Sequence, residues 1–231
     1  MNRNEDVLLP FERRCARALE ELRDNPELAT SEARLGPTAK NLDDPAIVFE
    51  SLAEDEQLPL DPTFRQYFFR FNDAKAHWRS PRAGSELVGE FHLTHLYRSV
   101  FENHMDYTWE GNNDSERELY RDLRIFDDTP STGTGRMAAL RATPGSTDPE
   151  IWYFDMRRGA TRMDLGYGPY LDNLLVTKGT IGWQYLFCQV DLGDSSVRAL
   201  ADGLKEMLDV LPRLFPHYDY SQLRTRLEER L

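Results

Sequence analysis

The sequence predicts an α+β fold in which helices pack on an antiparallel sheet, with an extra helix at the N-terminal end and more helices at the C-terminal end. Two observations support this. Short segments with the alternation of β-strands lie between residues 85 and 166, and stretches with helical spacing lie on either side of them. The order is helices, strands and helices, without regular alternation, which favours an antiparallel sheet.

The first predicted element is an amphipathic helix over residues 10–24. Its apolar residues recur at helical intervals: Phe11, Cys15, Ala18, Leu19 and Leu22. Residues 25–45 lose this periodicity and accumulate Pro, Gly and polar residues, which predicts a linker. We therefore divide the chain into an N-terminal helix with its linker, residues 1–44, and an α+β domain with a C-terminal helical extension, residues 45–231.

The next element is an aromatic-rich helix in the stretch LPLDPTFRQYFFRFNDAKAHW. Asp61 is suited to cap a helix and Pro62 to occupy its first turn. Phe64, Phe68 and Phe71 would then share one face. This spacing predicts three rings buried in the core rather than a ligand pocket.

The middle of the chain contains the predicted strands. Residues 85–93 and 136–142 have strand-like sequences, and a hairpin turns at Arg158 and Gly159. Between the first two strands, a short helix is followed by a loop at EGNND.

The last third of the chain is predicted to be helical. Apolar residues recur at helical spacing in the stretches 167–179, 195–211 and 219–231. Ser195 or Ser196 is expected to cap the second of these helices, and Pro212 to end it. Residues 182–190 are short enough to form either a helix or a strand, and their spacing does not decide between the two.

Composition and charge restrict the function. The chain has 231 residues, of which 40% are hydrophobic and 29% charged, as in ordinary globular proteins. No stretch approaches the length of a membrane span, and the first residues lack the apolar run of a secretory signal, so we expect a cytoplasmic protein. A formal net charge of −12 argues against binding to nucleic acid. It favours a basic partner, although an acidic excess also serves solubility.

A metal site is not expected. His92, His95 and His104 are close in sequence, but no HExxH motif, cysteine or carboxylate accompanies them at ligand spacing. Cys15 and Cys188 lie far apart, outside any CxxC motif, and are predicted to be reduced, buried thiols.

No catalytic or cofactor-binding residue is predicted either. The TGTGR segment at residues 132–136 lacks the Lys-Ser/Thr pair of a P-loop and the full GxGxxG of a dinucleotide-binding turn. GxSxG is absent, and with 40 Asp and Glu residues no pair of carboxylates stands out as an acid–base pair.

Five segments of the chain, within residues 47–187, resemble the SUKH superfamily of Smi/Knr-like proteins in type and order. They are LPLDPTFRQYFFRF, ELVGEFHL, IFDD, EIWYFDM and YGPYLDNLL. The chain departs from the family pattern in two ways. It has Asn72-Asp73-Ala74 where the family has Asn-Gly-Gly, and it carries extra segments at both ends.

This resemblance implies a protein-binding α+β module without catalysis. Many bacterial members of the superfamily resemble immunity proteins that neutralise a toxin, and others resemble regulatory scaffolds. We expect an immunity protein whose acidic surface binds a basic toxin domain, with a regulatory or scaffold protein as the alternative and an enzyme of unrecognised class third.

The predicted partner-binding surface lies within residues 104–122, where two large rings adjoin an acid-rich loop. Its residues are Asp106, Tyr107, Trp109, Glu110, Asp114, Glu116 and Glu118. Trp and Tyr often anchor interfaces, and the surrounding acids would attract a basic partner. In the alternative interpretation, Trp109 packs back onto the sheet and the last three acids form a solvated helix face.

Overall fold

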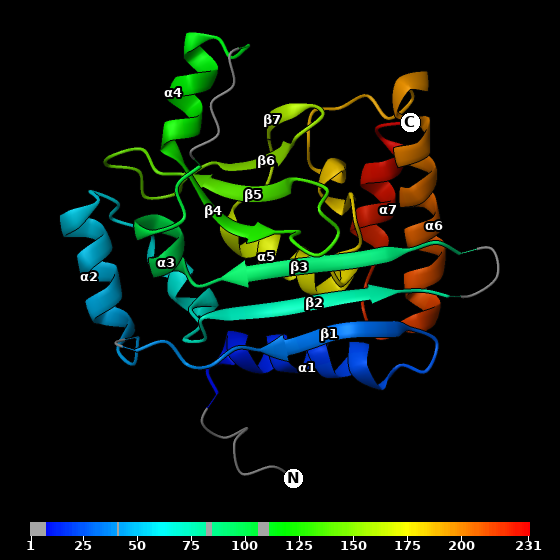
Figure 1. Ribbon diagram of the computed structural model, residues 1–231, viewed down its shortest axis with the longest axis horizontal. Coiled ribbons are helices and arrows are strands. Elements are labelled where there is room, and N and C mark those ends of the chain that lie inside the picture. The colour runs from blue at the N-terminus through cyan, green and yellow to red at the C-terminus, as the bar shows by residue number, and fades with distance from the viewer. Residues whose placement is uncertain (1–7, 41, 82–84, 106–110) are drawn as a thin grey trace.

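The computed structural model describes residues 8–40, 42–81, 85–105 and 111–231. Its strands form one sheet in the order β1 to β7, in which each strand pairs antiparallel with the next along the chain (Figure 1). The strands are β1 (Ala29–Leu35), β2 (Asp73–Arg79), β3 (Val88–Thr94), β4 (Leu123–Asp128), β5 (Arg136–Arg141), β6 (Ile151–Asp155) and β7 (Gly159–Arg162). The predicted α+β class with an antiparallel sheet and helices at both ends is confirmed.

Helices flank this sheet at both ends of the chain. The α-helices are α1 (Pro10–Asp24), α2 (Pro45–Asp55), α3 (Leu96–Phe101), α4 (Asp114–Asp122), α5 (Tyr167–Thr177), α6 (Arg198–Leu214) and α7 (Ser221–Glu228). Short 3₁₀ helices are η2 (Pro62–Tyr67), η3 (Trp183–Leu186) and η4 (Ser195–Val197). None of the helices in the described segments combines the length and apolar character needed to cross a bilayer.

The sheet has a core face and an outer face. On β2, Ala74, Ala76 and Trp78 are buried in the main hydrophobic cluster with α1, α5 and α6, and the residues between them point the other way. On the outer face, α4 covers β4 to β6 through a second cluster that includes Tyr120 and Phe154. No helix is drawn in front of β1 to β3 (Figure 1). The described helices therefore leave their outer face uncovered, although Glu90 of β3 is buried there and accepts the backbone N–H groups of Ser131 and Thr132.

The linker predicted over residues 25–45 is wrong for its middle part, because residues 29–35 form the edge strand β1. Only Ala33 of this strand is buried, so its sequence lacks the alternation that marks a strand. Backbone hydrogen bonds to β2 hold these residues in a strand, which their composition did not indicate. Phe11 and Leu22 of α1 belong to the same core cluster as the sheet.

The aromatic-rich helix is also shorter than predicted. Asp61 caps it as expected, but it is a 3₁₀ helix that ends at Tyr67, and Phe68 is extended. Phe68 contacts Phe49 on one side, with ring centroids 6.2 Å apart, and Phe69 contacts Phe11 on another, at 6.0 Å. In extended backbone, adjacent side chains point to opposite sides, so Phe68 and Phe69 reach different ring partners. The 3₁₀ helix therefore ends before these two residues.

The burial of the three predicted rings differs. Phe64 and Phe68 are buried, with 5% and 4% of their surface exposed. Phe71 is only partly buried, because it follows the extended segment and lies in a bridge to Thr38.

Pro212 does not end α6, which continues to Leu214. A proline has no N–H and leaves the carbonyl four residues earlier without its helical donor. Here that carbonyl belongs to Leu208, and the guanidinium of Arg224 on α7 donates a hydrogen bond to it. A distant residue thus supplies the donor that the proline removes.

The remaining elements agree with the sequence more closely. The hairpin of β6 and β7 and the helix at 167–177 are confirmed, and residues 183–186 form a 3₁₀ helix. Neither serine caps α6, because both belong to η4, which Asp194 caps by accepting the backbone N–H of Ser196; the N-cap of α6 is Val197, without a side-chain bond.

Candidate partner-binding surface

Four residues of the predicted partner-binding surface lie outside the described residues: Asp106, Tyr107, Trp109 and Glu110. The other three lie on α4, which projects from the upper left of the molecule in Figure 1. Asp114 and Glu118 are exposed, with 96% of the Asp114 side chain accessible.

Glu116 has a structural role at the start of α4. Its backbone N–H donates to Asn113 Oδ1 at 2.9 Å, and its carboxylate accepts the Asn113 N–H at 2.9 Å. These two bonds form a capping box, which satisfies groups that a helix start leaves unpaired. Glu116 therefore contributes to the stability of α4.

The charge of α4 is mixed rather than acidic. Arg117 and Arg121 alternate with its acids, and Arg117 lies 3.7 Å from Asp114. A basic partner would therefore face both acidic and basic side chains on this helix.

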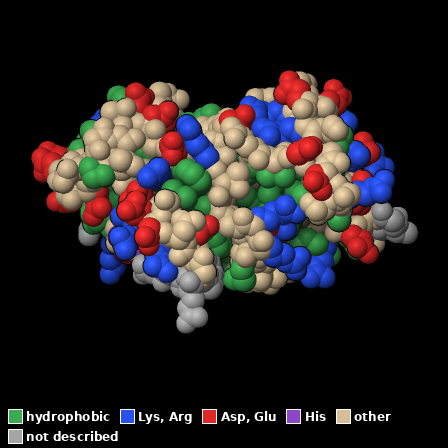
Figure 2. Space-filling model, turned by 90° about the horizontal axis from the view of Figure 1, so that it is seen from above, with side chains coloured by type: hydrophobic (Ala, Val, Ile, Leu, Met, Phe, Trp, Pro, Cys, Tyr) green, Lys and Arg blue, Asp and Glu red, His purple; other side chains and the backbone are tan. Residues whose placement is uncertain are grey.

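A more acidic stretch of the chain lies on and around α2, with Arg65 as a neighbouring cation, 5.3 Å from the centroid of the Phe49 ring. Residues 42–64 contain seven acids and neither Lys nor Arg: Asp43, Asp44, Glu50, Glu54, Asp55, Glu56 and Asp61. Glu56 is half-buried and the other six are exposed. Figure 2 shows Asp and Glu side chains, with basic ones among them, at the left end of the molecule, where Figure 1 places α2, and again at the upper right.

The sequence of α2 explains which residues it exposes. Asp44 caps the helix by accepting the backbone N–H of Ala46 at 2.8 Å, and Pro45 follows in the first turn. One side of the helix buries Val48, Phe49 and Leu52. The other side presents Ile47, Glu50 and Glu54, which share a face because they are three and four residues apart. Ile47 is 59% exposed.

The acids at the end of α2 reduce the stability of the fold. Glu54, Asp55 and Glu56 lie near the C-terminus of the helix, where the helix dipole favours cations, and no basic residue occupies the last turn. None of the three forms an ion pair with the part of the chain that is described. The seven acids and Ile47 are called the α2 acidic surface below.

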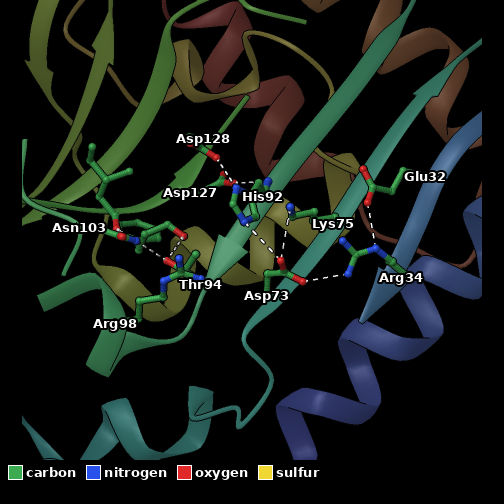
Figure 3. Close-up of polar contacts among 12 residues, drawn as sticks. Glu32, Arg34, Asp73, Lys75, His92, Thr94, Arg98, Asn103, Asp127 and Asp128 are labelled. Atoms are coloured by element: carbon green, nitrogen blue, oxygen red, sulfur yellow. Dashed lines mark hydrogen bonds and ion pairs between the residues drawn. The ribbon is translucent and has the colours of Figure 1, made fainter. Parts of the chain in front are cut away.

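The open outer face of β1 to β3 carries charges that neutralise one another (Figure 3). Asp73 lies 3.2 Å from Arg34, 3.4 Å from Lys75 and 3.6 Å from His92. His92 Nδ1 lies 2.8 Å from Asp128 Oδ1. These side chains form a paired network and leave no excess of one sign.

A cavity of about 240 Å³ adjoins His92 at the edge of this network. A His–carboxylate pair can transfer protons. The other polar groups in the cavity are already bonded: Arg98 pairs with Glu102 at 3.3 Å, and Asn103 donates to Thr94 at 3.1 Å. Within the described segments, no nucleophilic side chain is hydrogen-bonded to His92.

The three histidines considered at the sequence level have separate roles. His92 belongs to the network described above, and His95 caps α3 by accepting the backbone N–H of Arg98 at 3.1 Å. Burial lowers the pKa of His95 to about 4, so its ring is neutral near pH 7. His104 Nε2 lies 3.3 Å from the carbonyl of Phe101. The described residues contain no group of three or more His, Cys, Asp or Glu placed to hold a metal ion.

A β-bulge in β4 determines which of two adjacent carboxylates faces the core. Ile125 belongs to the outer cluster, and the extra residue turns both Phe126 and Asp127 to the core face. Asp127 therefore meets Tyr170 in the core, and Asp128 meets His92 outside. Sequence alone gave no sign of the bulge.

Both cysteines are buried and free, as predicted. Burial raises the pKa of Cys15 and of Cys188 to about 12, so their thiols stay protonated and unreactive near neutral pH.

Comparison with protein-family profiles, curated proteins and solved structures gave no match to this chain.

Proposed function

We propose that this protein is a non-catalytic protein-binding module that neutralises a basic partner, as an immunity protein does with a toxin, and that the α2 acidic surface makes the contact. The observation that carries this proposal is the excess of acids over residues 42–64, where seven acids occur without Lys or Arg and three of them lie at the C-terminal end of α2, a position that the helix dipole disfavours. Natural proteins retain such local costs where function requires them.

Charge and shape both fit this role. The acids on and around α2 would attract a basic partner over long range and raise the association rate. Ile47 lies among these acids on the exposed face of α2 and supplies an apolar contact that is buried once the partner docks. Helix α4, which carries Asp114 and Glu118, lies in the same half of the molecule as α2 (Figure 1).

The resemblance to the SUKH superfamily supports the same reading, since its members include immunity proteins and regulatory scaffolds. Toxins that attack nucleic acid present basic clefts, which an acidic inhibitor can occupy. The proposal places the protein in the cytoplasm, where such a toxin would act. A regulatory scaffold would use the same surface, and the identity of the partner distinguishes the two.

Affinity capture from the native cell tests the proposal with three versions of the full chain. These are the wild type, the α2 variant Glu50→Lys with Glu54→Lys, and a control variant Asp202→Lys with Asp209→Lys. Both variants change the net charge equally, on exposed positions of a helix. We expect the wild type and the control to retain the same basic protein and the α2 variant to lose it. Equal retention by all three would place the contact elsewhere.

A further inference from the structure

A cavity of about 650 Å³ lies between the β6–β7 turn and the start of α6. Arg136, Arg157 and Arg158 line one side of it, and apolar residues such as Val197 and Leu200 line the other. We call it the arginine cavity. It combines a cationic wall with an apolar wall in a chain whose formal net charge is −12.

The carboxylate of Asp155, which lines the cavity, already has hydrogen-bond partners within the fold. Asp155 Oδ2 accepts hydrogen bonds from Arg136 Nε and from the Tyr185 hydroxyl, both at 2.8 Å, and its Oδ1 accepts the backbone N–H of Arg157 at 2.9 Å. Burial opposes ionisation, but these bonds outweigh it and lower the pKa of Asp155. The carboxylate therefore stays charged and neutralises Arg136.

Arg157 and Arg158 keep their charges unpaired, since neither forms an ion pair within the described segments. Asp194 acts on Arg158 only at longer range, and its carboxylate is engaged in capping Ser196. The arginine cavity thus has an excess of two positive charges.

Arg158 is exposed and lies near one aromatic ring. Its guanidinium carbon lies 6.0 Å from the centroid of the Tyr185 ring. Tyr185 is itself fixed by an edge contact with Tyr153 at 5.2 Å and by its bond to Asp155. A guanidinium placed on an aromatic ring keeps its N–H donors available for an anion.

Gly203 leaves space on the opposite wall. It lies in the interior of α6, where glycine weakens a helix, and it lines the cavity. A Cβ atom at this position would meet no other atom within 4 Å, so packing does not require glycine here. Its effect is to keep the cavity open.

From these contacts we infer that the arginine cavity binds a small organic anion, with a phosphate or carboxylate group on the arginines and an apolar body against α6. This function is separate from the proposed role of the α2 acidic surface. Figure 1 places α2 at the left end of the molecule and the start of α6 at the right.

Calorimetric titration of the full chain tests the inference with three probes: phenyl phosphate, benzoate and the uncharged benzyl alcohol. We expect at least one anion to bind with a Kd below about 1 mM, and benzyl alcohol to bind at least about tenfold more weakly. The anion that binds more tightly identifies the anionic group. Lack of binding by both anions, or equal binding of benzyl alcohol, would overturn the inference.

Three variants locate the site. Arg157→Gln with Arg158→Gln should weaken anion binding at least about tenfold. Gly203→Leu should abolish it by filling the cavity, with a melting temperature at or above that of the wild type. The control Arg162→Gln, an exposed arginine of β7 outside the cavity, should bind like the wild type. Unchanged affinity in the double arginine variant would contradict the inference.

Discussion

The hydroxyl of Tyr170 on α5 donates a 2.7 Å hydrogen bond to the carboxylate of Asp127 on β4, inside the core. The backbone N–H of His92 donates to the same carboxylate at 3.1 Å. Burial nevertheless raises the pKa of Asp127 from 3.8 to about 7. The core of this protein therefore contains a carboxyl group that changes its charge near neutral pH.

Asp127 should make the protein less stable as the pH rises. Its folded pKa lies above its unfolded pKa, so its contribution to stability is complete below about pH 4 and is lost as the pH rises through about 7. Asp127→Asn should remove this loss and stabilise the protein at pH 8 by about 1 to 3 kcal/mol. Urea unfolding between pH 4 and 8 measures it.

The matched control for this prediction is Asp128→Asn, which changes the adjacent carboxylate on the outer face and leaves the bond from Tyr170 to Asp127 intact. It should keep most of the wild-type loss of stability between pH 4 and 7, because burial is the main cause of the raised pKa of Asp127 and the charge of Asp128 a smaller one. The same slope in Asp127→Asn would show that this carboxyl group does not titrate in the core.

Glu12 should hold α1 against the rest of the fold. Its fully buried carboxylate accepts bonds from the Arg70 guanidinium and from the Leu9 and Arg70 backbone, at 2.7 to 2.9 Å. Removal of one partner of a buried pair is costly, so Glu12→Gln should lower the free energy of unfolding by about 3 to 5 kcal/mol. Chemical denaturation checks this, with the exposed Glu20→Gln of the same helix as a control that should change little.

The pH dependence of this ion pair has the opposite sign to that of Asp127. Burial favours the neutral form of Glu12, but the hydrogen bonds outweigh it and its pKa is lowered below 4.5. Its contribution is therefore present above about pH 4.5 and is lost as the pH falls through the folded value. Glu12→Gln should be least damaging at low pH. A constant deficit at every pH would contradict this.

Truncation of Phe68 and of Phe71 should have different effects on stability, although the sequence predicts both rings on one buried helix face. Phe68 is buried against Phe49, so Phe68→Ala should cost about 3 to 5 kcal/mol. Phe71 is only partly buried, and Phe71→Ala should cost distinctly less. Thermal melting of the two variants compares them. Equal losses, or a Phe68→Ala variant that melts within a degree or two of the wild type, would refute the assignment.

Substitutions of the two central acids of α4, Glu116 and Glu118, should have different effects on stability. Glu116→Lys breaks the capping box and should lower stability by about 1 kcal/mol, whereas Glu118→Lys changes an exposed position and should leave stability nearly unchanged. Thermal melting distinguishes them. Glu118→Lys is therefore the suitable probe of charge on this helix, and a loss of stability as large as that of Glu116→Lys would disqualify it.

The sequence predicts the elements whose signals are local. The helix at 167–177 and the hairpin of β6 and β7 each carry a periodicity or a turn that short stretches reveal. The strand β1 has one buried side chain and depends on bonds to β2, and α6 passes Pro212 because Arg224 supplies a donor from another helix. Such partners are distant in sequence, so spacing does not disclose them.

The surface predicted at residues 104–122 and the proposed α2 acidic surface depend on different signals. The absence of Lys and Arg from residues 42–64 can be read directly from the sequence, but aromatic residues drew the prediction to residues 104–122. Only the fold shows that α2 turns Glu50 and Glu54 outward beside Ile47. A count of unbalanced acids along the chain would have identified this segment.

The association rate of the captured partner tests the central claim most directly. It is measured for the wild type and for Glu50→Lys with Glu54→Lys, at about 50 mM and about 500 mM salt. If the α2 acidic surface attracts a basic partner, the variant should associate at least about tenfold more slowly at low salt, and the difference should shrink at high salt. Equal association rates for the two proteins at low salt would contradict the account.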